Sequence, residues 1–258
     1  MRFLSPGAQG MRLGILASTL PFGSKLRFYA DNAEKLFEVS GLEVLATIRR
    51  NAEAGDFSDA GRIYWSPNLG GEAVTMEVEV PSQADTATVS IAIPVLSHAT
   101  VDIRKLDSLL KIGESASCNL DVPCTNDHNQ LSQSVALMDF VGDGTGGTTS
   151  GASYVCTGTL LNDRMSTGTP WFLSAKHCIA SQTVASTLYT FWFYRSSSCN
   201  SGVVNAGAKV LTTGATLLYV SPDVATGQTL KGDASFMRLN STPPSGHIRT
   251  DIEQRGPG

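Results

Sequence analysis

The five cysteines of this 258-residue chain all lie beyond residue 111, and their spacing limits how that part of the chain can fold. They are Cys118, Cys124, Cys156, Cys178 and Cys199. None of the spacings matches a CxxC redox or zinc pair, so the pattern predicts a disulfide framework. Because the count is odd, one thiol is expected to lack its partner within this chain. Residues 1–111 contain no cysteine, which indicates a separate domain.

Charge and hydropathy exclude several classes of partner. The formal net charge is −4 at pH 7, with no dense run of lysine or arginine, so neither nucleic acid nor an anionic membrane is an expected partner. No apolar run approaches the roughly 18 residues that span a bilayer. The N-terminal stretch is interrupted by Pro6, Gly7 and Gly10, and no signal peptide is visible in it. We expect a soluble, folded protein, since 41% hydrophobic residues suffice for a core.

The first domain is expected to be a β-sandwich over residues 1–111. Residues 11–18 and 25–30 flank the turn signal TLPFGS and predict a hairpin, while residues 73–80 and 87–96 alternate apolar and polar side chains. The exception is a short helix predicted after residue 40. Leu42, Leu45 and Ile48 fall near helical spacing there, and Gly55 is expected to stop it.

The second half predicts short strands separated by turns, as in a β-barrel or sandwich. From residue 112 the composition shifts toward Ser, Thr, Gly and Cys, and GDGTGG at residues 142–147 is interpreted as a turn. The strand candidates are residues 154–161, 170–175, 186–195, 207–214, 216–221 and 234–239. We assign residues 112–246 to this domain and expect the polar residues 247–258 to form an unstructured tail.

The stretch WFLSAKHC places His177 directly beside Cys178. A general base needs a fixed orientation, and a disulfide at the neighbouring residue is one way to fix the backbone that carries it. Cys156 lies 22 residues upstream in YVCTGTLL. Two adjacent antiparallel strands joined by the NDRMSTGTP loop would bring the sulfurs of Cys156 and Cys178 together.

These segments resemble a known family. CTGTLLND followed by WFLSAKHC is similar to the paired segments of trypsin-like serine proteases. Five stretches in order resemble the first half of the lysyl endopeptidase branch: GESASCNLDVPC, CTGTLLND, WFLSAKHC, FWFYRSSSC and GDASFMRL. The resemblance implies a mostly β chain, in which a β-sandwich-like propeptide region precedes the first β-barrel of an incomplete chymotrypsin-like double barrel.

The resemblance also implies roles for single residues. His177 would be the general base, and Asp233 would be the carboxylate that holds the imidazole tautomer. Disulfides would join Cys156 to Cys178 and Cys124 to Cys199, and Cys118 would be unpaired. No metal or cofactor is implied, and the substrates would be proteins or peptides.

The nucleophile of this family is not found in the chain. After Asp233 the only serines are Ser235, Ser241 and Ser245, and none lies in a Gly-x-Ser-Gly type loop. The GDGTGG stretch has Thr145 where serine belongs and precedes the histidine. The chain is therefore expected to be a secreted serine endopeptidase precursor that is inactive as written.

The N-terminal half supports the interpretation as a zymogen fragment. Residues 26–41, 64–81 and 93–102 look similar to the β-rich end of the propeptide that precedes the protease in bacterial relatives. Cleavage after Lys111 would free the mature N-terminus, and a lysine-specific enzyme could process that site itself.

Other interpretations are open from the residues alone. His177 could be a satisfied histidine at a strand end, and Asp233 a turn aspartate after Gly232. A zinc site using His177 and Cys178 is awkward, because adjacent strand residues point to opposite faces, and the same geometry disfavours Cys178 as a nucleophile. The alternative function is a non-enzymatic, secreted β-rich binding or adhesion protein that uses a protease-like scaffold.

Overall fold

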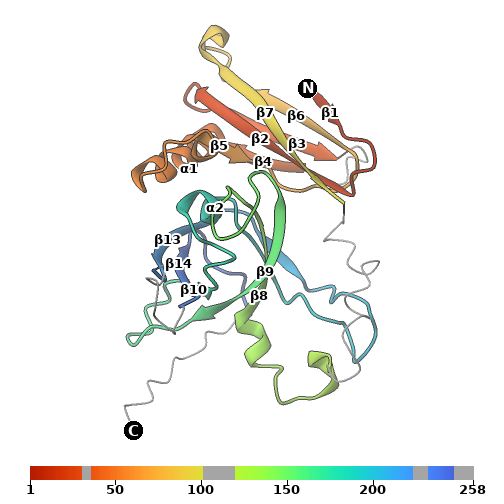
Figure 1. Ribbon diagram of the computed structural model, residues 1–258. Coiled ribbons are helices and arrows are strands. Elements are labelled where there is room, and N and C mark those ends of the chain that lie inside the picture. The colour runs from red at the N-terminus through yellow and green to blue at the C-terminus, as the bar shows by residue number, and fades with distance from the viewer. Residues whose placement is uncertain (31–35, 101–119, 223–231, 247–258) are drawn as a thin grey trace. The chain divides into compact units, whose positions relative to one another are not determined.

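The computed structural model describes residues 1–30, 36–100, 120–222 and 232–246, and these are mostly β (Figure 1). By its internal contacts the chain divides into two compact units. The first holds residues 1–105 with the short segments 141–143 and 149–153, and the second holds the remainder. The residues predicted as an unpaired thiol (Cys118), a processing site (Lys111) and a tail (247–258) lie outside the described residues.

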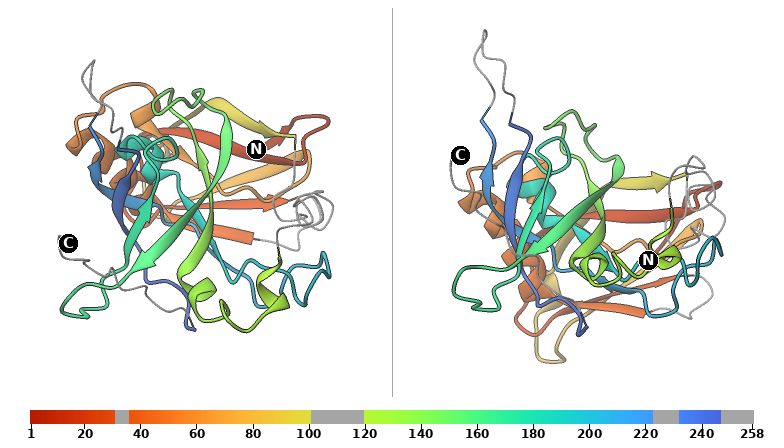
Figure 2. Two further views of the ribbon diagram at one scale, coloured as in Figure 1. Left: turned by 60° about the horizontal axis from the view of Figure 1, so that its bottom comes forward. Right: turned by 90° about the horizontal axis from the view of Figure 1, so that it is seen from below.

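The first unit contains two antiparallel sheets. One has the strand order β1-β6-β3-β4 and the other β5-β2-β7. The two longest strands, β2 and β7, run side by side in Figures 1 and 2. The bounds are β1 (Arg2–Leu4), β2 (Gly10–Thr19), β3 (Lys25–Ala30), β4 (Leu36–Ser40), α1 (Gly41–Glu53), η1 (Ala60–Arg62), β5 (Ile63–Trp65), β6 (Ala73–Glu79), η2 (Thr86–Thr88) and β7 (Ser90–Ala99).

The two sheets of the first unit share one hydrophobic core. Leu13 and Ile15 of β2 come from one sheet, and Phe28 of β3 and Val74 of β6 come from the other. All four side chains are fully buried. Because a single cluster draws on both sheets, the unit is a β-sandwich, as its alternating strand patterns predict.

The hairpin predicted from residues 11–18 and 25–30 is wrong. Strand β2 pairs with β5 and β7, whereas β3 pairs with β4 and β6 in the other sheet. The intervening turn buries Leu20 in the shared core, and Ser24 closes the turn by donating its backbone N–H to the carbonyl of Pro21. The predicted turn is present, but it carries the chain from one sheet to the other.

The predicted helix is confirmed, and two of the three apolar residues that suggested it, Leu45 and Ile48, pack against the core of the first unit. Gly55 follows α1 with a φ of 91°, a conformation that glycine adopts without strain. The buried positions of α1 include Val44, Thr47 and Asn51, whereas Leu42 is 68% exposed.

Among the described residues, no helix is long and apolar enough to cross a membrane.

The second unit is built on one antiparallel sheet with the order β12-β11-β8-β9-β10-β14-β13. The sheet curls into a half-barrel, and the strong curvature of β9 is visible in Figures 1 and 2. All six strand predictions for this half are confirmed. The bounds are η4 (Val122–Cys124), η5 (Leu131–Ser134), β8 (Val135–Val141), β9 (Ser153–Leu161), β10 (Trp171–Ser174), α2 (Gln182–Ser186), β11 (Tyr189–Trp192), β12 (Lys209–Leu211), β13 (Ala215–Val220) and β14 (Ser235–Leu239).

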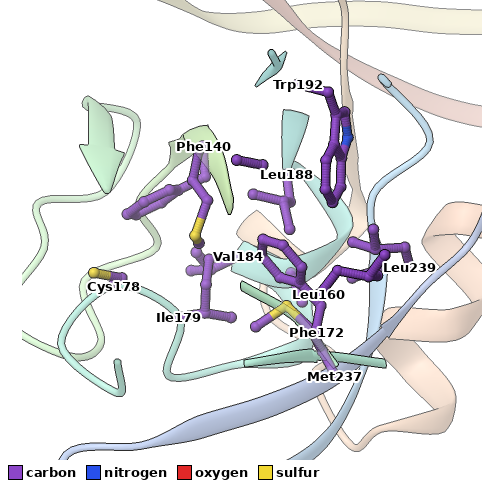
Figure 3. Packing of buried hydrophobic residues seen from close by; sticks show 14 residues of the cluster. Phe140, Leu160, Phe172, Cys178, Ile179, Val184, Leu188, Trp192, Met237 and Leu239 are labelled. Carbon is purple, nitrogen blue, oxygen red and sulfur yellow. The ribbon is translucent and has the colours of Figure 1, made fainter. Parts of the chain in front are cut away.

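The core of the half-barrel is packed around Phe172 of β10. Figure 3 shows its ring among Leu160, Val184 and Met237, and all four side chains are almost fully buried. Trp192 of β11 is 0% exposed and meets the ring edge-on with centroids 6.0 Å apart. Buried side chains of β9 and β10 pack in the same cluster, which fixes the position of one strand relative to the other.

A glycine in β9 makes this close packing possible. A Cβ atom at Gly158 would lie 2.2 Å from Cε1 of Phe172, closer than any real contact. Position 158 therefore admits no side chain, and the aromatic ring lies directly against the backbone of β9.

The loop between β9 and β10 is held by one carboxylate. Asp163 accepts hydrogen bonds from the hydroxyl and backbone N–H of Thr167, from Nε1 of Trp171 and from the backbone N–H of Met165. These bonds, led by that of the Thr167 hydroxyl, lower the pKa of Asp163 to about 2. The loop therefore has a defined shape at neutral pH, and it connects the two strands that lead to the candidate site.

Candidate active site

The backbone turn after β10 separates His177 from Cys178. The amides of Cys178 and Ile179 both donate to the carbonyl of Ala175, which closes the turn. The side chain of Cys178 joins the core and is 4% exposed, whereas that of His177 is 65% exposed. One residue of the pair anchors the turn, and its neighbour presents an imidazole to solvent.

The described part of the second unit contains two disulfides. Cys156 of β9 is bonded to Cys178, with their Cα atoms 6.3 Å apart. Cys124 is bonded to Cys199, with Cα atoms 4.4 Å apart. The first bridge ties the turn that carries His177 to the neighbouring strand.

The structure brings His177 and Asp233 together. Asp233 lies just before β14, which pairs with β10 up to Ser174 and Ser235. Its Oδ2 atom is 2.6 Å from Nδ1 of the imidazole, and its Oδ1 atom accepts the backbone N–H of His177 at 2.9 Å. The histidine thus contacts both oxygens of the carboxylate, one through its ring and one through its backbone.

The same hydrogen bonds favour the ionised form of Asp233. The backbone N–H of His177, the imidazole and the backbone of Lys176 lower the pKa of this carboxyl. A carboxylate facing Nδ1 favours the tautomer with its proton on that nitrogen, which leaves Nε2 as a hydrogen-bond acceptor. The pair can therefore accept a proton at Nε2 while the carboxylate stabilises the resulting imidazolium.

The thiols needed for a zinc site or a cysteine nucleophile are joined to each other. Donor atoms of Cys156, His177 and Cys178 lie within 4.8 Å of one another. The expectation that His177 and Cys178 point to opposite faces of a strand does not apply, because His177 lies in a turn rather than on a strand. The sulfurs of Cys156 and Cys178 are bonded to each other in a disulfide, and a disulfide sulfur is neither a thiolate ligand nor a nucleophile.

The first two serines after Asp233, Ser235 and Ser241, lie at opposite ends of β14. Ser235 is 0% exposed, and its hydroxyl donates to the carbonyl of Ala175 at 3.0 Å. Ser241 follows the far end of β14, which at about 3.3 Å per residue carries the chain well away from Asp233. Neither arrangement presents a hydroxyl to the imidazole.

The GDGTGG stretch is a turn that packs against the histidine turn, a contact that the sequence does not predict. The carbonyl of Thr145 accepts the backbone N–H of Thr148. Gly146 has a φ of 60°, and a Cβ atom there would lie 3.0 Å from the carbonyl oxygen of Lys176. The only signal for this contact is the glycine itself, which permits close approach of two backbones.

Comparisons with known proteins find relatives for both parts of the chain. Residues 1–100 match the family described as lysyl endopeptidase N-terminal domain, and residues 112–252 match that described as lysyl endopeptidase, C-terminal domain. The chain is 31% identical over 251 residues to a lysyl endopeptidase of Pseudomonas aeruginosa. This alignment covers 93% of the chain and 48% of that protein, so the chain spans about half the length of the curated relative it matches.

Proposed function

Because the chain belongs to the lysyl endopeptidase family, we propose that it carries the general base and its orienting carboxylate for a serine endopeptidase. The observation that carries the proposal is the pairing of His177 with Asp233. The two are joined through Nδ1 at 2.6 Å and through the backbone at 2.9 Å, on a turn anchored by a disulfide. This is the arrangement that a base in nucleophilic acyl transfer requires.

In this mechanism Nε2 of His177 takes the proton from a serine hydroxyl as that oxygen attacks the peptide carbonyl. The imidazolium is stabilised by Asp233 and returns the proton to the leaving amine. The proposed substrates are proteins or peptides cleaved at lysine, by analogy with the name of the relative from Pseudomonas aeruginosa.

We further propose that the nucleophile is not among the residues of this chain, so that the chain alone does not cleave peptide bonds. A fluorophosphonate probe, which reacts with activated serines, is expected to leave the purified chain unlabelled while it labels trypsin in the same reaction. The measurement is the mass of the intact protein. Labelling that disappears in the His177→Ala variant would show that a serine of this chain is activated, and the proposal would be wrong.

Residues 1–111 are proposed to be a propeptide and residues 112–246 part of the protease domain of a secreted precursor. The support is the separate match of each half to its own family domain. In a precursor that also carries the nucleophile, N-terminal sequencing of the secreted mature protein should then give Ile112 as the first residue, and the Lys111→Gln variant of that precursor should not be cleaved there. A mature start far from Ile112 would contradict this division.

A further inference from the structure

The two side chains of the candidate pair are largely exposed, yet they are aligned. His177 is 65% exposed and Asp233 is 51% exposed, so packing against neighbouring side chains does little to hold either of them. Their alignment must then come from the backbone segments that carry them. Those segments are held by two buried serines, Ser221 and Ser235.

Ser221 binds both peptide groups of the residue that follows the carboxylate. Its backbone N–H donates to the carbonyl of Ala234 at 2.8 Å, and its hydroxyl accepts the backbone N–H of Ala234 at 2.9 Å. Ser221 is 5% exposed and directly follows β13. On the other side of Asp233, a Cβ atom at Gly232 would lie only 2.9 Å from the Ser221 hydroxyl. The chain around Asp233 therefore fits closely around Ser221.

Ser235 links the carboxylate strand to the histidine turn. The pairing of β10 with β14 ends at Ser174 and Ser235, and the chain leaves β10 at Ala175. The Ser235 hydroxyl donates to the carbonyl of Ala175 at 3.0 Å, so a side chain continues the connection after the backbone pairing has ended. The same carbonyl accepts the amides of Cys178 and Ile179 that close the turn. Ser235 thus joins the turn that carries His177 to the strand that follows Asp233.

We propose that Ser221 and Ser235 are positioning residues for the His177–Asp233 pair, an inference that rests on the proposed function. Both hydroxyls are buried and bound to backbone groups, so neither is available for chemistry itself. Each fixes one of the two backbone segments, and loss of either should let the carboxylate and the imidazole move relative to each other. Buried hydrogen bonds of this kind are costly to leave unmade, which favours a single geometry.

The test uses Ser221→Ala and Ser235→Ala in the chain as it is, with Ser134→Ala as the matched control. Ser134 is also buried in the second unit, at 1% exposure, and its hydroxyl also donates to a backbone carbonyl, that of Leu131 at 2.7 Å. Two quantities are measured by NMR: the hydrogen-exchange rate of the His177 backbone amide, relative to that of Phe172, and the imidazole tautomer from its ¹⁵N shifts. Two independent variants keep the test decisive if one of them fails to fold.

In each test variant the relative exchange rate of the His177 amide should rise about fivefold, since a typical hydrogen bond contributes that factor to an equilibrium. The imidazole should change from the Nδ1–H form to a mixture of tautomers. Ser134→Ala should leave both readings unchanged. A uniform increase in exchange over the whole unit, or an unchanged tautomer, would overturn the proposal. These readings require no turnover, so they can fail independently of the fluorophosphonate experiment.

Discussion

Replacing Phe172 with alanine should lower the free energy of unfolding of the second unit by about 3–5 kcal/mol. The ring is 0% exposed and lies at the centre of the half-barrel core, against the edge of Trp192 (Figure 3). Removing it forfeits the transfer free energy of an aromatic side chain and leaves a cavity. Gly158, which faces the ring from β9, has no side chain that could move into this cavity. Urea denaturation followed by tryptophan fluorescence measures the change.

The matched control for this substitution is Leu173→Ala, one residue along β10. Leu173 is 37% exposed, and its side chain points away from the core. Its removal should cost less than about 1 kcal/mol. Equal losses for the two variants would show that the core of the unit is not centred on Phe172.

Removing the Cys156–Cys178 disulfide should destabilise the second unit by about 3 kcal/mol. The bridge closes a loop with a sequence separation of 22 residues, and in the chain-entropy model such a loop restricts the unfolded chain by that amount. Both cysteines are changed to alanine together, so that no single thiol is left. The midpoint of urea denaturation, with an unchanged slope, reports the loss.

The second disulfide provides an internal comparison. Cys124 and Cys199 are separated by 75 residues, and the same model gives about 4 kcal/mol for their loop. The double alanine variant of this pair should therefore be the less stable of the two. If the variant without the Cys156–Cys178 bridge were the less stable of the two, native contacts around Cys178, which is buried in the core, would contribute more than the difference in loop-closure entropy.

Local patterns predict much of this fold, but not the pairing of its strands. The alternation of residues 154–161 and 234–239 is sufficient to predict β9 and β14. Strand β8 escapes prediction because VALMDFV is apolar almost throughout and shows no clear period of two. The predicted hairpin of β2 and β3 is wrong because a turn signal does not specify which sheet the chain enters next.

The candidate site is predictable where its signal is contiguous in the sequence. The adjacent His177 and Cys178, with Cys156 at hairpin distance, are together a local signal for an oriented base. Asp233 depends on the resemblance of a short motif. Ser221 and Ser235 carry no signal of their own, because Ser235 acts on Ala175, 60 residues away, through a contact that only the folded sheet creates.

The exposure of the His177–Asp233 pair also determines how strong their attraction can be. Water around the pair screens the attraction between an imidazolium and a carboxylate, and lowering the effective dielectric constant from about 80 to about 20 would strengthen it about fourfold. A protein surface that covered the pair would therefore increase its electrostatic coupling without moving either residue. The backbone already aligns the imidazole with the carboxylate, and exclusion of solvent would strengthen the attraction between them.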